Sequence, residues 1–172
     1  MRRFLVLPLL ALLLGMLPAF GFNYQRYEAA DLDAVLGQNR PRAGFDTYPA
    51  LPLKLDVTLA SYAEPCQTDL LIRVMKMVGL TIDPKVKISR CIKVRSSKGA
   101  QLRVFIQDLV SDFLPKEVPL GHQLTLFAVH LYTTPEGPGL LVNEFKSNAS
   151  GNATKAAAAA PSQVRRGANE LE

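Results

Sequence analysis

The sequence predicts a mainly β domain of the α+β class, folded as a small antiparallel sheet or a partly open barrel with one or two short helices. Several stretches between residues 51 and 145 alternate apolar and polar side chains, which is typical of half-buried strands. Turn sequences rich in glycine, proline and serine separate these stretches. Helical repeats cover only a short segment at 28–36, which Gly37 ends, and residues 69–78. Together these observations indicate a domain built mainly of strands.

The first 21 residues have the three-part layout of a secretory signal peptide. Arg2 and Arg3 precede an almost unbroken apolar run over residues 4–17, and small residues follow at Ala19 and Gly21, the −3 and −1 positions of a cleavage site. We expect cleavage after Gly21, with cleavage after Ala19 as a variant. A retained membrane anchor is the alternative, but the run is shorter than the ~20 residues that cross a bilayer, Pro8 interrupts it and Pro18 follows it.

Removal of the leader leaves about 150 residues, a length that suits one domain. The low-complexity end of the chain is predicted to be disordered. It carries two glycosylation acceptor sequences, at Asn148 and Asn152, which are either glycan sites of a eukaryotic secreted protein or chance matches in this composition. The predicted organisation is a signal peptide at 1–21, an N-terminal extension with a short helix at 22–50, a β-rich globular domain at 51–146 and a disordered tail at 147–172.

Export places the protein in an oxidising compartment, periplasmic or extracellular, where an even number of cysteines usually means a disulfide. We therefore expect Cys66 and Cys91 to be bridged; two separate buried thiols are the alternative. The two cysteines have no CxxC spacing, and His122 and His130 lie far along the chain, so they do not form a zinc-binding set. We predict neither a metal site nor a cofactor, and no transmembrane span once the leader is cleaved.

The globular domain begins with a strictly alternating strand at residues 51–60. Residues 69–78 follow as a helix, with Thr68 as its cap and Gly79 after its end. A buried strand is the alternative for this segment, because β-branched and other apolar residues leave little polar face.

Residues 85–95 and 100–107 alternate on either side of a Ser-Ser-Lys-Gly turn and predict a β-hairpin. The predicted order of elements loosely resembles that of an oligonucleotide/oligosaccharide-binding type barrel or a similar small barrel. This likeness of fold carries no function with it. The elements predicted after the hairpin are a helical turn at 108–113 and strands at 123–133 and 140–145.

Charge is segregated along the chain. The whole chain carries a net charge of +5. Without the two arginines of the leader it is too weakly basic to indicate nucleic-acid binding, and an exported protein rarely meets nucleic acid. From Arg73 to Arg103 there are nine basic residues and one acidic residue, whereas residues 104–145 hold five acidic residues and one basic residue. The domain is therefore polarised rather than generally basic.

Alternation places most of the hairpin's basic side chains on one face, where a returning strand adds another. Such a face can hold an anionic polysaccharide, a lipid headgroup or an acidic protein. A solvated face kept basic to prevent edge pairing is the alternative. Arg90 falls on the apolar face, which a bulge, a strand-edge position or a buried ion pair would explain. The predicted binding residues are Lys85, Lys87, Lys93, Arg95 and Arg103.

No sequence motif predicts catalysis: neither Gly-x-Ser-x-Gly nor HExxH occurs, and we assign no catalytic residue. His122 and His130 share one face of their predicted strand with apolar residues and are expected to be packed or edge histidines. We expect an exported, non-enzymatic binding or adaptor domain that contacts an anionic envelope component or a partner protein through the basic hairpin. The alternative is an exported hydrolase that uses acids such as Asp108 and Asp112 with a histidine.

Overall fold

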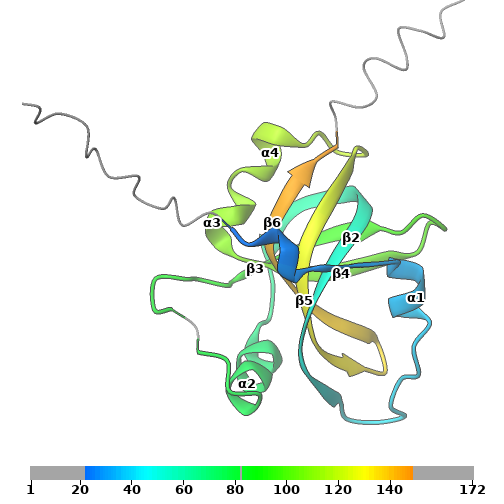
Figure 1. The fold of residues 1–172 in the computed structure, drawn as a ribbon, viewed down its shortest axis with the longest axis vertical. Helices are drawn as coiled ribbons and strands as arrows, with labels where there is room; N and C mark the ends of the chain where they lie inside the picture. The colour runs from blue at the N-terminus through cyan, green and yellow to red at the C-terminus, as the bar shows by residue number, and fades with distance from the viewer. Residues whose placement is uncertain (1–21, 82, 149–172) are drawn as a thin grey trace, which may run out of the picture.

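A computed structural model describes residues 22–81 and 83–148 (Figure 1). Residues 1–21, predicted as a signal peptide, lie outside the described residues, as do residues 149–172, which hold Asn152 and most of the predicted tail. None of the helices in the described ranges is long and apolar enough to cross a membrane. The elements in chain order are a 3-10 turn η1 (Tyr24–Arg26), β1 (Glu28–Ala30), α1 (Leu32–Leu36), β2 (Asp46–Pro65), α2 (Asp69–Met77), β3 (Arg90–Arg95), β4 (Gln101–Ile106), α3 (Asp108–Ser111), α4 (Leu114–Glu117), β5 (Gln123–Thr134) and β6 (Gly137–Ser147).

The strands form one six-stranded sheet in the order β1-β2-β3-β4-β6-β5, and β2 also pairs with β5. The pairings therefore run in a ring through five strands, as in a partly open barrel. The ring is irregular, because β4 and β6 pair over only two residue pairs and the registers of β2–β3 and β5–β6 shift. Pairing is mixed, since β1–β2 and β4–β6 are parallel and the other pairs are antiparallel. The mainly β class predicted from the sequence is confirmed.

The main core fills the inside of this ring. Every ring strand contributes fully buried aliphatic side chains, such as Leu59 of β2, Ile92 of β3 and Leu126 of β5. Helix α4 closes one end, because Leu114 and the following Val118 are completely buried in the same core. In Figure 1 this helix lies at the top of the barrel and α2 at the bottom.

A second apolar cluster lies between α2 and the sheet. Leu71, Val74 and Met75 of the helix pack against Leu131 of β5 and Leu141 of β6. These helical residues share one side, which is the helical spacing expected from the sequence. Residues 69–77 are thus a helix, and the alternative of a buried strand is wrong.

Several boundaries differ from the sequence expectations because strand partners are distant in the chain. Residues 28–30, predicted as helix, pair with β2 instead, and α1 starts only at Leu32. β2 begins at Asp46 rather than 51, since Asp46 and Thr47 already pair with β5. β6 extends from Gly137 to Ser147 and so takes in part of the predicted loop and the first residue of the predicted tail.

The predicted disulfide is present: Cys66 and Cys91 are bonded. The bridge joins the residue that follows β2 to the second residue of β3 and so closes the excursion that contains α2. Both ends of this long segment are therefore fixed at the same edge of the barrel.

Replacing Cys66 and Cys91 together by serine should lower the free energy of unfolding by about 3–4 kcal/mol, because the unfolded chain regains the entropy of an open loop of this length. Urea denaturation of the oxidised wild type and the double variant measures the difference. Equal stabilities would show that the bridge does not hold the excursion in place.

Gly139 of β6 is required by its cross-strand neighbour. Tyr132 of β5 is its register partner, and a Cβ atom on residue 139 would overlap the Tyr132 ring. The ring therefore lies directly across the glycine, with Phe45 at its edge at 6.5 Å between centroids.

Gly139→Ala should destabilise the protein by about 1–3 kcal/mol, because the added methyl group displaces the ring. A double-mutant cycle with Tyr132→Leu tests the cause: the loss at residue 139 should largely disappear once the ring is gone. Additive effects in thermal denaturation would contradict this packing.

Candidate functional site

Three of the five predicted binding residues share one outward face of the hairpin. Lys93 of β3 lies opposite Arg103 of β4, and Arg95 lies opposite Gln101. Arg95 and Arg103 are exposed, whereas Lys93 is half-buried. We call these three residues (Lys93, Arg95 and Arg103) the basic face.

The other two predicted residues, Lys85 and Lys87, lie outside the strand, which is a correction to the predicted alternation. Asp83 and Pro84 start a turn in which Asp83 Oδ1 accepts a hydrogen bond from the Lys85 amide at 2.9 Å. The chain therefore enters β3 only at Arg90. The Lys87 ammonium lies 3.9 Å from Asp108 Oδ2.

The basic face has few acidic partners. Lys93 Nζ lies 3.6 Å from Glu64 Oε1. Within the described ranges, the side chains of Arg95 and Arg103 make no ion pair or hydrogen bond. Like charges directly opposite each other destabilise a pair of strands, so the Lys93–Arg103 pair works against folding. An anion bound between them would remove that repulsion.

The hairpin is fixed at both ends. At its turn, the Asp33 carboxylate of α1 accepts hydrogen bonds from Ser96 Oγ at 2.6 Å and from the Lys98 amide at 3.1 Å. The bond from Ser96 is the main reason that the pKa of Asp33 lies below its ordinary value. At its base, Asp108 accepts from the amide and the hydroxyl of Ser89 at 2.8 and 2.7 Å. The basic face is therefore presented on a supported element.

A groove of about 580 Å³ opens beside Arg103, where β4 diverges from β6. Gln101, Arg103 and Phe105 of β4 form one wall. The opposite side comes from the segment around α2 and from the β5–β6 turn. We call this the β4–β6 groove; its other polar lining residues are Gln67, Asp69, Arg73, Tyr132, Thr134 and Glu136.

The charges of the groove are mixed. The Arg73 and Arg103 side chains have no ion-pair partner in the described part of the chain, while Asp69 and Glu136 also line the groove. Hydrogen bonding by Thr134 lowers the pKa of Glu136, which therefore stays ionised at neutral pH. The groove thus offers cations at separated points rather than a continuous positive surface.

Tyr132 lies in the wall of the groove and is only 5% exposed. Its hydroxyl makes no hydrogen bond with the described residues. Burial raises the pKa of Tyr132 to about 12, so the group stays protonated at neutral pH and can donate a hydrogen bond.

Arg90, which the sequence left unexplained, is the first residue of β3 and forms an ion pair. Its guanidinium lies 2.7 Å from Asp112 Oδ1 and donates to Ser111 Oγ at 3.0 Å. It thus joins α3 to the hairpin. The ion pair is partly exposed rather than buried, so of the three explanations only the position at the end of the strand applies as stated.

The two acids of the hydrolase alternative and His130 have other partners, and His122 is exposed. Asp108 bonds to Ser89, and Asp112 bonds to Arg90. His130 is buried, with Nε2 at 3.0 Å from both Tyr132 O and Thr133 Oγ1. Among residues 22–81 and 83–148, no group of three or more His, Cys, Asp or Glu side chains is placed to hold a metal ion.

Sequence reasoning missed several groove residues. Phe105 could have been found, since it alternates with Arg103 on the same predicted strand face. Arg73 lies on the polar side of the predicted helix and carried a weaker signal. Tyr132 carried no signal in the sequence, because it lines the groove only where β4 and β6, which are distant from each other in the chain, diverge.

The chain matches no family model, no curated protein and no solved structure.

His130 makes stability depend on pH. Burial lowers the pKa of this imidazole below its ordinary value near 6.5, although a hydrogen bond to the Tyr132 carbonyl opposes the shift. The unfolded chain then binds more protons than the folded one below that value. As the pH is lowered below 6.5, the free energy of unfolding should therefore decrease, by up to about 1.4 kcal/mol per pH unit.

Urea titrations between pH 7.5 and about 5.5 measure this dependence. His130→Gln should flatten the slope, and His122→Gln, at an exposed position, should leave it unchanged. A slope that survives His130→Gln would assign the effect to another group.

Proposed function

We propose that this protein is an exported, non-enzymatic binding domain whose ligand is an anionic envelope polysaccharide held on the basic face and in the β4–β6 groove. The observation that carries the proposal is the like-charge pair Lys93–Arg103, in which Lys93 has an acidic partner, Glu64, and Arg103 has none among the described residues. Arg95 lies on the same face. Like charges placed opposite each other on neighbouring strands oppose folding.

Export is supported by two features. The leader has the layout of a signal peptide, and the Cys66–Cys91 bridge suits an oxidising compartment. In this proposal the leader is removed after Gly21, and the exported chain begins at Phe22.

Protection of a sheet edge explains the basic face less well. It applies to Arg103, since residues 101–104 of β4 have no register partner on β6. It does not apply to Lys93 and Arg95, because β3 pairs with β2 on one side and with β4 on the other. A ligand accounts for all three residues.

The groove favours a polysaccharide with spaced carboxylates over other anions. Arginine pairs geometrically with carboxylate, and the amides of Gln67 and Gln101 and the hydroxyl of Tyr132 suit sugar hydroxyl groups. Asp69 and Glu136 would repel a densely charged polyanion but not a chain with intervals between its charges.

Replacing Arg95 and Arg103 together by glutamine should weaken binding of a galacturonate hexasaccharide by about tenfold, because two guanidinium contacts are lost. The matched control is Lys85→Gln with Lys87→Gln, which removes the same charge outside the basic face. Isothermal titration calorimetry measures both affinities, and binding to the wild type should weaken as salt is added.

Absence of hexasaccharide binding, or equal losses in the two double variants, would contradict the proposal. Single-stranded DNA of matched length is a second probe: tighter binding of DNA through Arg95 and Arg103 would reject the polysaccharide as the ligand class.

A further inference from the structure

We propose that the protein has a second ligand site, an apolar cavity that takes a single acyl chain with an anionic head group. The cavity lies between the N-terminal segment and the outer face of β5 and β6, and its volume is about 410 Å³. Ligand sites for small molecules have volumes of about 300–1,000 Å³ and walls that are mainly apolar with a few polar groups. This site is separate from the β4–β6 groove.

The floor and one wall of the cavity are apolar. Val129 and Leu131 of β5 and Leu141 of β6 form the floor, while Met75 of α2 and Ile88 line the side. Leu131, Leu141, Met75 and Ile88 are each at most 8% exposed, so these side chains are fixed by packing. An acyl chain would bury apolar surface against them at a gain of roughly 25 cal/mol per Å².

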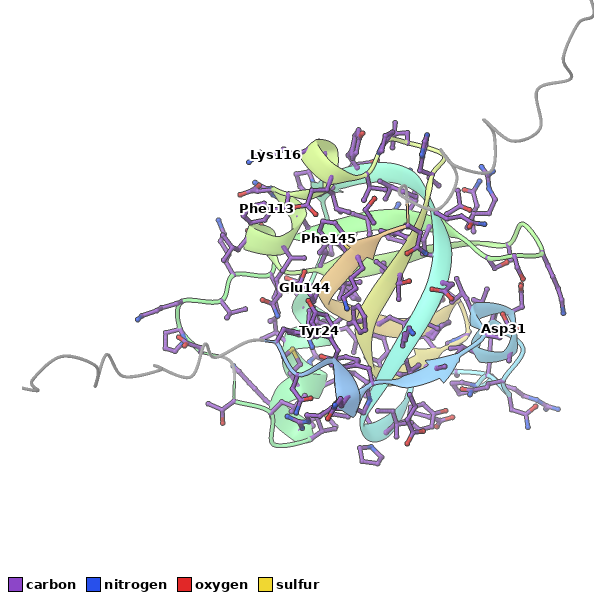
Figure 2. All side chains as sticks on the ribbon, turned by 45° about the horizontal axis from the view of Figure 1, so that its top comes forward. Tyr24, Asp31, Phe113, Lys116, Glu144 and Phe145 are labelled. Atoms are coloured by element: carbon purple, nitrogen blue, oxygen red, sulfur yellow. A yellow bond between two sulfur atoms is a disulfide. The ribbon has the colours of Figure 1, made fainter. Side chains whose placement is uncertain are left out.

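The opposite wall is the N-terminal segment, which aromatic contacts hold on the sheet. Phe22 and Tyr27 line the cavity, and their rings lie 5.9 and 5.5 Å from that of Phe127. Lys146 Nζ lies 3.7 Å from the centroid of Tyr24. Figure 2 shows Tyr24 on this segment near Glu144 of β6. Burial, and after it the charge of Glu144, raises the pKa of Tyr24.

A hydrogen-bonded chain of polar groups adjoins the apolar surface. Asn143 accepts from Gln107 Nε2 at 2.8 Å and donates through Nδ2 to the Tyr27 hydroxyl oxygen at 3.1 Å. The Tyr27 hydroxyl hydrogen is then free to be donated to a ligand. All three residues line the cavity.

A cation gives this site its preference for an anionic head group. Arg26 lines the cavity, and its side chain makes no ion pair or hydrogen bond with the described residues. Its guanidinium can therefore pair with the carboxylate of a fatty acid, whose tail lies on the floor. Asp83 also lines the cavity, but its Oδ1 already accepts a hydrogen bond from the Lys85 amide. The Arg26 guanidinium and the apolar lining together favour an anionic amphiphile.

Cleavage of the leader, which is part of the proposed function, would strengthen anion binding at this site. If the exported chain begins at Phe22, its α-amino group becomes a second cation on a residue that lines the cavity. Acetylation of that amino group should then weaken anion binding without changing the apolar walls.

The test uses the chain Phe22–Glu172 with dodecanoate below its micelle concentration as the probe, in calorimetry and native mass spectrometry. We expect one dodecanoate per chain. Ala50→Trp, which fills the cavity, should abolish binding. Leu51→Trp should not, because Leu51 is a neighbouring residue that is 43% exposed and outside the cavity.

The preference for an anionic head group is tested by a second pair of variants. Arg26→Gln should weaken binding about three- to tenfold, and Arg42→Gln, at an exposed control position, should leave it unchanged.

Circular dichroism of each variant separates loss of the site from loss of the fold. The proposal would be overturned if the folded chain did not bind dodecanoate, or if it bound dodecyltrimethylammonium equally well. Equal effects of Ala50→Trp and Leu51→Trp on binding would also overturn it. A dimer that covers the cavity and excludes dodecanoate would also overturn it. The Arg95→Gln, Arg103→Gln variant should bind dodecanoate normally, so failure of this site and failure of the polysaccharide groove are distinguishable.

Discussion

The structure depends on the way one long strand is shared between two halves of the sheet. β2 pairs with β5 over most of its length and with β3 towards its end. Thr58 stands at the crossing point, because it has a register partner on both β3 and β5. This sharing closes the ring, and the Cys66–Cys91 bridge follows where β2 ends. The hairpin is therefore fixed relative to β5 and β6, which is the condition for a groove between them.

The two proposed ligand sites share a wall. Helix α2 contributes Arg73 to the β4–β6 groove and Met75 to the apolar cavity, while its buried residues pack on the outer face of the sheet. The disulfide fixes the excursion that carries α2. In these proposals, a polar and an amphiphilic ligand would bind on different sides of one helix.

The sequence predicts those features that are encoded locally. Alternation predicts that Lys93, Arg95 and Arg103 share a face, helical spacing predicts α2, and the leader makes the disulfide the expected state of the two cysteines. Features set by distant partners are not encoded in this way. β1, the start of β2 and the position of Tyr132 all depend on which strands become neighbours, and the turn at Asp83–Pro84 interrupts an alternation that otherwise includes Lys85 and Lys87.

The central claim is that β2 unites the hairpin and the β5–β6 pair in one cooperative barrel. Native-state hydrogen exchange of backbone amides tests it most directly, since it measures the opening free energy of each strand. The account predicts that paired amides in β2, β3 and β5 exchange with a common free energy equal to that of global unfolding. Exchange of the β3–β4 hairpin at a much lower free energy than β2–β5 would contradict it, because the basic face would then belong to a separate, loosely attached element.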